Sequence, residues 1–186
     1  MRLIYFIGQL LFIPHIVLFL TSKNRALIIK DLYARKPISR KGIKLYSDLT
    51  LELLKSRYFR TLFYFRIKGV YANVLRVFYP KHTSFTIDIN NKIGGGLKLA
   101  HPYATIINAE KIGENVYINH LVTIGDKNGK KPTIGSNVQI HANAIIIGDI
   151  TIGDNTIIGA GAVVVKNVPE NSVVVGNPAK IINTVR

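Results

Sequence analysis

From residue 106 to the C-terminus, the chain carries an aliphatic residue at nearly every sixth position. The members of this series are Ile106, Ile112, Ile118, Ile124, Ile134, Ile140, Ile146, Ile152, Ile158 and Val164. A helix repeats every 3.6 residues and a half-buried strand every two, so neither produces a period of six. A hexapeptide repeat predicts a solenoid in which each unit forms one short strand and one corner, and about eighteen residues close one coil.

A second set of buried-type residues follows four positions after most members of the first. It comprises Val116, Val122, Val138, Ala144, Ile150, Thr156, Ala162 and Val168. Gly and Asn tolerate the positive φ of a sharp corner, and they recur between the strands, as in Glu114-Asn115, Ser136-Asn137 and Asp154-Asn155. Because one coil cannot bury its own apolar face, the coils must stack. The sequence therefore predicts a mainly β fold.

This part of the chain resembles the hexapeptide-repeat acyltransferases, whose fold is a left-handed parallel β-helix. It is most similar to serine acetyltransferases and to the O-acetyltransferases of bacterial surface-polysaccharide loci. The segments that carry the resemblance are Ile87-Asp88-Ile89, Lys92-Ile93-Gly94 leading to His101, Val122-Thr123-Ile124-Gly125, Ile158 to Val164, and Val175 to Lys180. The left-handed winding is implied by this resemblance and not by the periodicity.

Charge and aromatic content divide the chain near Pro80. Residues 1–80 carry 15 Lys and Arg against 3 Asp and Glu, a net +12, whereas residues 81–186 carry 10 against 7, a net +3. The first part also holds 14 of the 17 aromatic residues. We therefore predict an N-terminal hydrophobic and basic helical region at 1–80, and a left-handed β-helix acyltransferase domain at 81–186.

Two segments of the N-terminal region suit contact with a membrane. Leu3 to Leu20 is almost wholly apolar, barely long enough to span a bilayer, and followed by no cleavage motif. Pro14 would kink a spanning helix, which fits a re-entrant or interfacial segment at least as well as a crossing. Ile43 to Tyr79 has the apolar spacing of a helix with basic residues interspersed; it suits an anionic surface or a cap on the solenoid. We expect a cytoplasmic protein, peripheral on the inner face of the bacterial cytoplasmic membrane.

Several other classes of function are disfavoured. The charge of +15 also fits a nucleic-acid partner, but the basic residues cluster beside a hydrophobic stretch and no nucleic-acid motif appears. We predict no nucleic-acid partner. The chain contains no Cys, which excludes disulfides, thiolate metal sites and a thiol acyl-enzyme.

Acyl transfer from a thioester to a hydroxyl needs a base, and His is suited to this at neutral pH. Counting three hexads per coil places His101, His120 and His141 on one side in successive coils, and we assign no role to His15 or His82. Coils stack about 4.8 Å apart, so the first and last of the three would be nearly 10 Å apart, too far for one zinc ion. We therefore predict no metal in the site.

The resemblance implies roles for particular residues. His101 corresponds to the catalytic base, and Asp88 to the carboxylate that orients its imidazole. We place His120 and Lys131 at the acceptor; the loop Asp126 to Pro132, which breaks the repeat, would overhang that site.

Acetyl-CoA is the donor that the resemblance implies, bound in a groove between two subunits of a homotrimer. The backbone amides of Ala142 and Ala160 match positions that contact its pantetheine arm. Lys166 and Lys180 match positions near its phosphates, where a cation is suited.

Three elements of serine recognition or context, as serine acetyltransferases have them, are missing from the sequence. Ala100 stands where serine acetyltransferases carry Asp, Lys130-Lys131 replaces an Arg-His pair, and Thr184-Val185-Arg186 provides no tail for docking to a cysteine synthase. We therefore predict an acetyl-CoA-dependent O-acetyltransferase that modifies a sugar hydroxyl, on a small-molecule or lipid-linked acceptor, in surface-polysaccharide biosynthesis. The alternatives are serine O-acetyltransferase of cysteine biosynthesis, N-acylation of a nucleotide sugar, and a non-catalytic hexapeptide scaffold.

Overall fold

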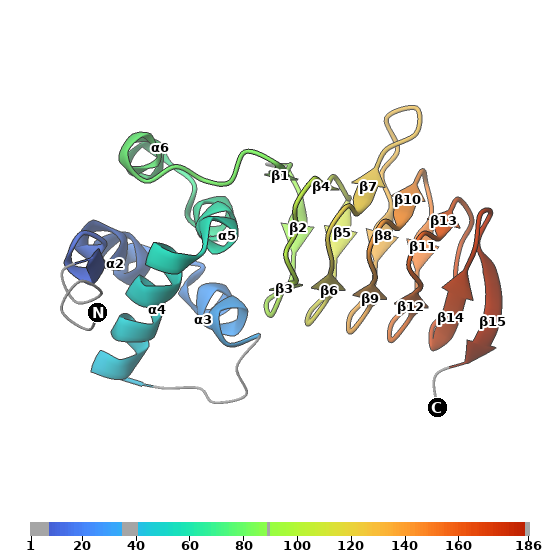
Figure 1. The fold of residues 1–186 in the computed structure, drawn as a ribbon, viewed down its shortest axis with the longest axis horizontal. Coiled ribbons are helices and arrows are strands. Elements are labelled where there is room, and N and C mark those ends of the chain that lie inside the picture. The colour runs from blue at the N-terminus through green and yellow to red at the C-terminus, as the bar shows by residue number, and fades with distance from the viewer. Residues whose placement is uncertain (1–7, 35–40, 89, 185–186) are drawn as a thin grey trace. The chain divides into compact units, whose positions relative to one another are not determined.

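A computed structural model describes residues 8–34, 41–88 and 90–184 (Figure 1). The chain divides into two compact units, Met1–His82 and Thr83–Arg186. The beginning of the predicted apolar stretch Leu3 to Leu20, Ile89 of the Ile87-Asp88-Ile89 motif, and the last two residues lie outside the described residues.

The N-terminal unit is helical. Its helices are α2 (Ile13–Thr21), α3 (Arg25–Tyr33), α4 (Ile43–Lys55), α5 (Arg57–Ile67) and α6 (Val70–Phe78). The predicted helix from Ile43 to Tyr79 is therefore three helices, because local residues interrupt it twice. Ser56 is extended, and its hydroxyl accepts a hydrogen bond from the Phe59 N–H, which caps α5. Lys68 and Gly69 have φ angles of 49° and 108°, which no helix continues through.

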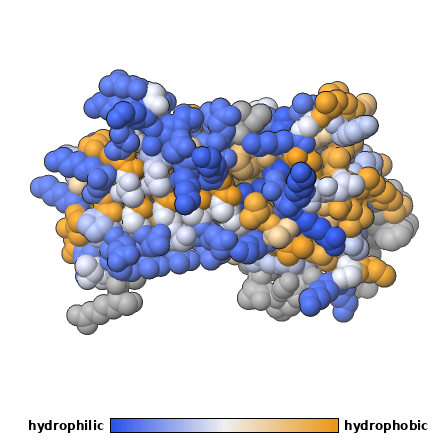
Figure 2. Space-filling view, turned by 180° about the vertical axis from the view of Figure 1, so that it is seen from behind, coloured by the Kyte–Doolittle hydropathy of each residue, from blue (hydrophilic) through white to orange (hydrophobic). Residues whose placement is uncertain are grey.

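Pro14 does not kink a helix. It stands in the first turn of α2, where its missing N–H costs no hydrogen bond. Among the described residues, no helix combines the length and the apolar character that a membrane crossing requires. Apolar side chains do gather on the outer surface of this unit (right in Figure 2). Membrane association stays a prediction.

The core of the N-terminal unit encloses charge as well as apolar side chains. Its buried cluster comprises Phe12, Phe19, Ile28, Leu32, Leu45, Leu49, Leu53, Phe59, Phe63, Tyr64 and Ala72. The Arg66 guanidinium forms a two-pronged ion pair with Asp31, at 2.8 and 3.2 Å, with both side chains at most 3% exposed. Arg60 is also buried, and it donates to the carbonyl oxygens of Leu53 and Pro80. These cations therefore fix the packing of the helices.

The C-terminal unit is a three-sided parallel β-solenoid, which confirms the predicted fold class (Figure 1). Sheet A contains β1 (Phe85–Ile87), β4 (Thr105–Ile107), β7 (Thr123–Gly125), β10 (Ile145–Ile147) and β13 (Val163–Val164). Sheet B contains β2 (Lys92–Ile93), β5 (Lys111–Ile112), β8 (Thr133–Ile134) and β11 (Thr151–Ile152). Sheet C contains β3 (Lys98–Leu99), β6 (Tyr117–Ile118), β9 (Gln139–Ile140), β12 (Ile157–Ile158), β14 (Ser172–Val175) and β15 (Lys180–Thr184). The last strand runs antiparallel to β14.

The predicted aliphatic series fills the interior of the solenoid, with one exception. From Ile112 to Val164 its members are at most 2% exposed, but Ile106 is 49% exposed. Ile107 is buried in its place and aligns with Ile124. The buried residues Ile107 and Ile112 are five positions apart, whereas the equivalent pair Ile146 and Ile152 is six positions apart. Counting back six positions from Ile112 therefore reaches Ile106, one residue before the buried Ile107. The prediction for Ile106 was wrong for this reason.

Asparagines form a column at the corner between sheets B and C. Asn115, Asn137, Asn155 and Asn171 each have a φ of 57°; the first three belong to the corner pairs that the sequence predicted. Each side-chain amide donates to the next along the column, over 3.4, 3.1 and 3.0 Å. The column therefore supplies both the turn geometry and a bond between successive coils.

This column predicts a graded loss of stability. We expect Asn155→Ala to lower the free energy of unfolding of the solenoid by about 2 kcal/mol, because it removes two side-chain hydrogen bonds and places Ala at a positive φ. Asn155→Gly keeps the turn and loses only the bonds, so it should cost about half as much. Urea unfolding of both variants measures the difference. Equal stability of the two would show that the backbone angle contributes nothing.

His15 lies at the centre of the N-terminal core, with no exposed surface. Its Nε2 lies 2.8 Å from the Tyr64 hydroxyl, and that hydroxyl donates to the carbonyl oxygen of Tyr79. The Tyr64 oxygen thus accepts from Nε2–H. Nδ1 is buried and has no hydrogen-bond partner among the described residues. Burial, and secondarily the charge of Arg60, lower the pKa of His15 from 6.5 to about 4.

The stability of the N-terminal unit should therefore depend on pH. The unfolded chain binds a proton at His15 below pH 6.5, whereas the folded unit does so only near pH 4. As the pH falls through this window, the unit should lose about 3 kcal/mol of stability from this residue. Urea unfolding followed by circular dichroism at helical wavelengths tests this. His15→Gln should flatten the loss between pH 6.5 and 4; an unchanged pH profile would show that another group causes it.

Candidate active site

One corner of the solenoid, between sheets C and A, gathers the three candidate histidines. His101 follows β3, His120 follows β6 and His141 follows β9, and these strands are neighbours in sheet C. The prediction that they share one side in successive coils is confirmed. The register aligns Leu99 with Ile118 and Ile140, so His141 stands one position earlier in its coil than His120.

His101 lies in a corner longer than its counterparts. Residues 100–105 join the aligned positions Leu99 and Ile106, whereas residues 119–122 span the same interval in the next coil. His101 is exposed, with a φ of 51°, and Pro102 after it is buried. The insertion therefore presents the imidazole to solvent on a corner held by a buried proline.

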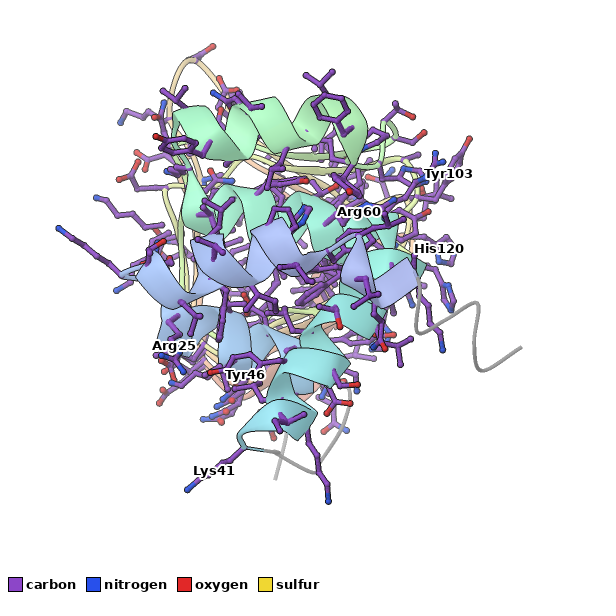
Figure 3. All side chains as sticks on the ribbon, turned by 90° about the vertical axis from the view of Figure 1, so that its left-hand side faces the viewer. Arg25, Lys41, Tyr46, Arg60, Tyr103 and His120 are labelled. Carbon is purple, nitrogen blue, oxygen red and sulfur yellow. The ribbon has the colours of Figure 1, made fainter. Side chains whose placement is uncertain are left out.

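Tyr103 stands in the same column as His120. The Leu121 N–H donates to the Tyr103 carbonyl oxygen, as the Asn143 N–H donates to that of His120. Tyr103 is 57% exposed, and Figure 3 shows it beside His120 at one edge of the unit. Sequence reasoning missed this residue. The signal was an aromatic residue two positions after the candidate base, where the chain turns.

The imidazole of His120 is held in one tautomer. Its Nδ1 lies 2.7 Å from Asn119 Oδ1, which also accepts from the His120 backbone N–H. Asn119 Nδ2 in turn donates to the Tyr117 hydroxyl. Because the amide oxygen can only accept, Nδ1 carries the proton and Nε2 presents its lone pair. His120 can thus accept a hydrogen bond from a substrate hydroxyl.

Asp88 lies at the opposite edge of sheet A from His101. It follows β1, and its N–H donates to the Ile107 carbonyl oxygen at the end of β4. The three residues of β4 separate the two edges by about 10 Å. The Asp88 carboxylate lies 3.6 Å from Lys131 Nζ and accepts from the Asn90 N–H. A hydrogen bond between Asp88 and His101 within one chain is therefore not formed.

Lys131 belongs to the same edge as Asp88. It is the last residue but one of the loop of residues 126–132, which protrudes between β7 and β8 (Figure 1). The backbones of Lys127 and Lys130 pair as an isolated antiparallel β-bridge within the loop. Lys130 Nζ donates a hydrogen bond to Asp149 over 2.8 Å, and this bond raises the pKa of Lys130. Lys131 thus anchors the base of the loop, across sheet A from His120.

The predicted acetyl-CoA residues continue the column of Tyr103 and His120. The Gly161 N–H donates to the Ala142 carbonyl oxygen, so Ala142 and Ala160 occupy matching positions in adjacent coils. In the part of the chain that the structure describes, neither of their own N–H groups donates to a protein acceptor. Two unused donors one coil apart suit the amide oxygens of an extended ligand.

Lys166 and Lys180 line one groove at the C-terminal end of the solenoid. The groove has a volume of about 410 Å³ and is otherwise walled mainly by Val164, Val165, Val174, Pro178 and Ile181. Both lysines are exposed. Two cations beside an apolar groove suit a ligand with phosphate and apolar parts. Within residues 8–34, 41–88 and 90–184, no three His, Cys, Asp or Glu side chains are grouped as a metal site requires.

The predicted residues therefore fall into separate groups on one chain. His101, His120, Ala142 and Ala160 lie at the corner between sheets C and A, whereas Asp88 and Lys131 lie at the far edge of sheet A. Within one chain the two edges therefore do not line a common site.

Known proteins share both the repeat and the larger fold. Residues 131–166 match the family described as bacterial transferase hexapeptide (six repeats). The chain is 43% identical over 123 residues to WcaB of Escherichia coli K12, named as a colanic acid biosynthesis acetyltransferase, covering 62% of this chain and 76% of that protein. It is 42% identical to the serine acetyltransferase of Buchnera aphidicola (Schizaphis graminum), covering 56% of this chain but only 43% of that protein.

A solved structure extends the similarity to the helices. The serine acetyltransferase of Neisseria gonorrhoeae, in complex with serine, superimposes with a TM-score of 0.67 at 33% identity, covering 86% of this chain and 69% of that one. A second structure of the same enzyme superimposes with a TM-score of 0.69 at 32% identity, covering 87% of this chain and 66% of that one. This coverage includes both the helical unit and the solenoid.

Proposed function

The chain belongs to the hexapeptide-repeat acetyltransferases, and from this premise we propose that it transfers an acetyl group from acetyl-CoA to a sugar hydroxyl in surface-polysaccharide biosynthesis. The observation that carries the choice of acceptor is the corner around His101. Neither 97–105 nor 117–125 contains an Asp or Glu, so this corner has no carboxylate of its own to bind the ammonium group of an amino acid. The Asp88 that we place beside it in a trimer orients the imidazole instead. A sugar has no such requirement.

The exposed groups of this corner fit a sugar. The Tyr103 ring offers an apolar face on which the C–H face of a pyranose can pack, and the lone pair of His120 Nε2 can accept from a ring hydroxyl. The similarity to WcaB, over 76% of its length, agrees with a polysaccharide precursor. Serine remains the second candidate, because the similar solved structures are serine acetyltransferases and one holds serine.

We assign the chemistry to His101. Its imidazole takes the proton of the acceptor hydroxyl as the oxygen attacks the thioester carbonyl, and a backbone N–H stabilises the resulting oxyanion. When the tetrahedral intermediate collapses, the C–S bond breaks and the imidazolium returns the proton to the CoA thiolate. Acetyl-CoA lies along the Ala142 and Ala160 amides, with its phosphates toward Lys166 and Lys180. No covalent acyl-enzyme is formed.

The separation of Asp88 from His101 supports a site shared between copies. We propose a homotrimer in which the Asp88 edge of one protomer meets the His101 corner of the next. Asp88 then orients the imidazole across the interface, and Lys131 lies beside the acceptor. The closed rotational symmetry makes three equivalent sites.

His101→Ala should reduce acetyl transfer by about 10²- to 10⁴-fold, because it removes the base. Release of the CoA thiol, followed with a thiol-reactive dye, measures this directly, since the protein has no Cys to react. His82→Ala is the control, and it should retain full activity. His120→Ala should mainly raise the KM for the acceptor.

The same assay separates the two acceptors. Thiol release should rise with a soluble polysaccharide-precursor sugar and remain unchanged with L-serine. Release that L-serine stimulates and His101→Ala abolishes would make serine the acceptor. Equal activity of His101→Ala and wild type with a competent acceptor would remove His101 from the mechanism.

Mixed trimers test the shared site. His101→Ala and Asp88→Asn should each be nearly inactive alone, but co-expression should restore about a quarter of wild-type activity. An Asp88→Asn copy still has His101, and a His101→Ala copy still has Asp88. A site is intact only where it takes its His from the first kind of copy and its Asp from the second, each with a probability of about one half. No recovery would exclude a site shared between copies, and full activity of Asp88→Asn would exclude the pairing.

A further inference from the structure

Helix α6 turns an apolar face outward. Its exposed residues Val70, Tyr71, Val74, Val77 and Phe78 are 52–79% exposed. Their spacing of three and four residues places them on one side of the helix. The other side, with Ala72, Leu75 and Tyr79, packs into the core of the N-terminal unit. This helix therefore has an apolar stripe that its own unit leaves uncovered.

Helix α2 and the turn before it repeat the arrangement. Leu10, Ile13, Val17 and Leu20 recur at spacings of three and four residues and are 46–56% exposed. Phe12, His15 and Phe19 on the opposite side are buried. The residues of α2 include no charged side chain.

The two stripes belong to neighbouring helices. The Tyr79 hydroxyl, just after α6, donates to the Leu11 carbonyl oxygen over 2.7 Å, and the Tyr79 ring lies 4.8 Å from that of Phe12 and 5.0 Å from that of His15. Hydrophobic atoms accordingly gather over this end of the unit in Figure 2. We call the exposed residues of both helices the α2/α6 surface.

The charge around the α2/α6 surface identifies its partner. Residues 1–80 carry a net +12, and one of their three acidic residues, Asp31, is buried against Arg66. Lys23 and Arg25 follow α2 and Lys68 precedes α6, whereas Arg76 of α6 packs its guanidinium over the Tyr64 ring with its Nε buried. Two copies meeting through so basic a surface would repel each other, whereas anionic lipid headgroups attract it.

We propose that the α2/α6 surface docks the protein on an anionic lipid bilayer. Both helices lie in the plane of the interface, because the inner side of each is already packed in the protein core. Their outer apolar side chains enter the boundary of the acyl chains, and the flanking Lys23, Arg25 and Lys68 contact the headgroups. This inference does not depend on the acceptor or on the catalytic residues.

Vesicle sedimentation tests the proposal. Wild-type protein should pellet with vesicles of 70% phosphatidylcholine and 30% phosphatidylglycerol, and much less with phosphatidylcholine alone or at high salt. Val74→Glu combined with Phe78→Glu should reduce binding by roughly tenfold for each side chain removed from the bilayer. Both residues are exposed, so the variant should fold, which circular dichroism verifies.

Ile43→Glu is the matched control. Ile43 is 86% exposed and begins α4, and Lys41, two residues before it, lies far from α6 in Figure 3. This variant should bind vesicles as the wild type does. Binding of the double variant equal to wild type, or no binding of wild type to anionic vesicles, would overturn the proposal. If the double variant instead lost oligomeric mass in light scattering, the surface would be an interface between copies. Thiol release by the double variant should equal that of the wild type, which would show that membrane docking and catalysis can fail independently.

Discussion

The stacking of aliphatic side chains inside the solenoid is the constraint on which the C-terminal unit depends. Ile118 lies in register between Leu99 and Ile140, and equivalent rows run along the other sheets. Side chains alternate between the two faces of a strand, so a slip of one residue would expose a whole row. The inward rows therefore fix the outward columns as well. His120 and Ala142 share a column because each stands two residues after an aligned buried residue, and Tyr103 joins them because its corner contains two extra residues.

The periodicity predicted this unit almost residue by residue, and its failure has a local cause. Every coil of the solenoid buries one residue in six, so a buried series as long as Ile112 to Val164 identifies the fold several times over. The corner after Ile106 is one residue shorter than the regular corner, and the repeats that follow give no indication of this difference. Corner length is set by turn conformation, which a pattern of aliphatic residues does not encode. In the helical unit, Ser56 and Gly69 broke the predicted helix for the same reason: the apolar spacing continues across both breaks.

For the site, the sequence predicted which side of the solenoid carries the histidines, but the pairing of Asp88 with His101 came from resemblance alone. Thirteen positions separate the two, about two thirds of a coil of eighteen, so within one chain they belong to different corners. Residue order therefore indicates where each group lies on its own coil. Residue order does not indicate the symmetry by which a corner of one copy would meet a corner of another. Tyr103 escaped notice because an exposed aromatic residue has no periodic signature.

The N-terminal unit shows why pattern alone does not identify a buried face. Helix α6 is apolar on both sides, so its spacing predicts a helix without indicating which side packs inward. Tyr79 determines which side of α6 packs inward, because its hydroxyl bonds to Leu11 and its ring packs against Phe12. Arg60 and Arg66 meanwhile bind groups inside the unit, whereas Lys23 and Lys68 are exposed. The outer surface thus joins apolar stripes to a large positive charge, a combination that water solvates poorly and an anionic bilayer accommodates. An enzyme held at such a surface meets a lipid-linked acceptor at a concentration raised by confinement to the same plane.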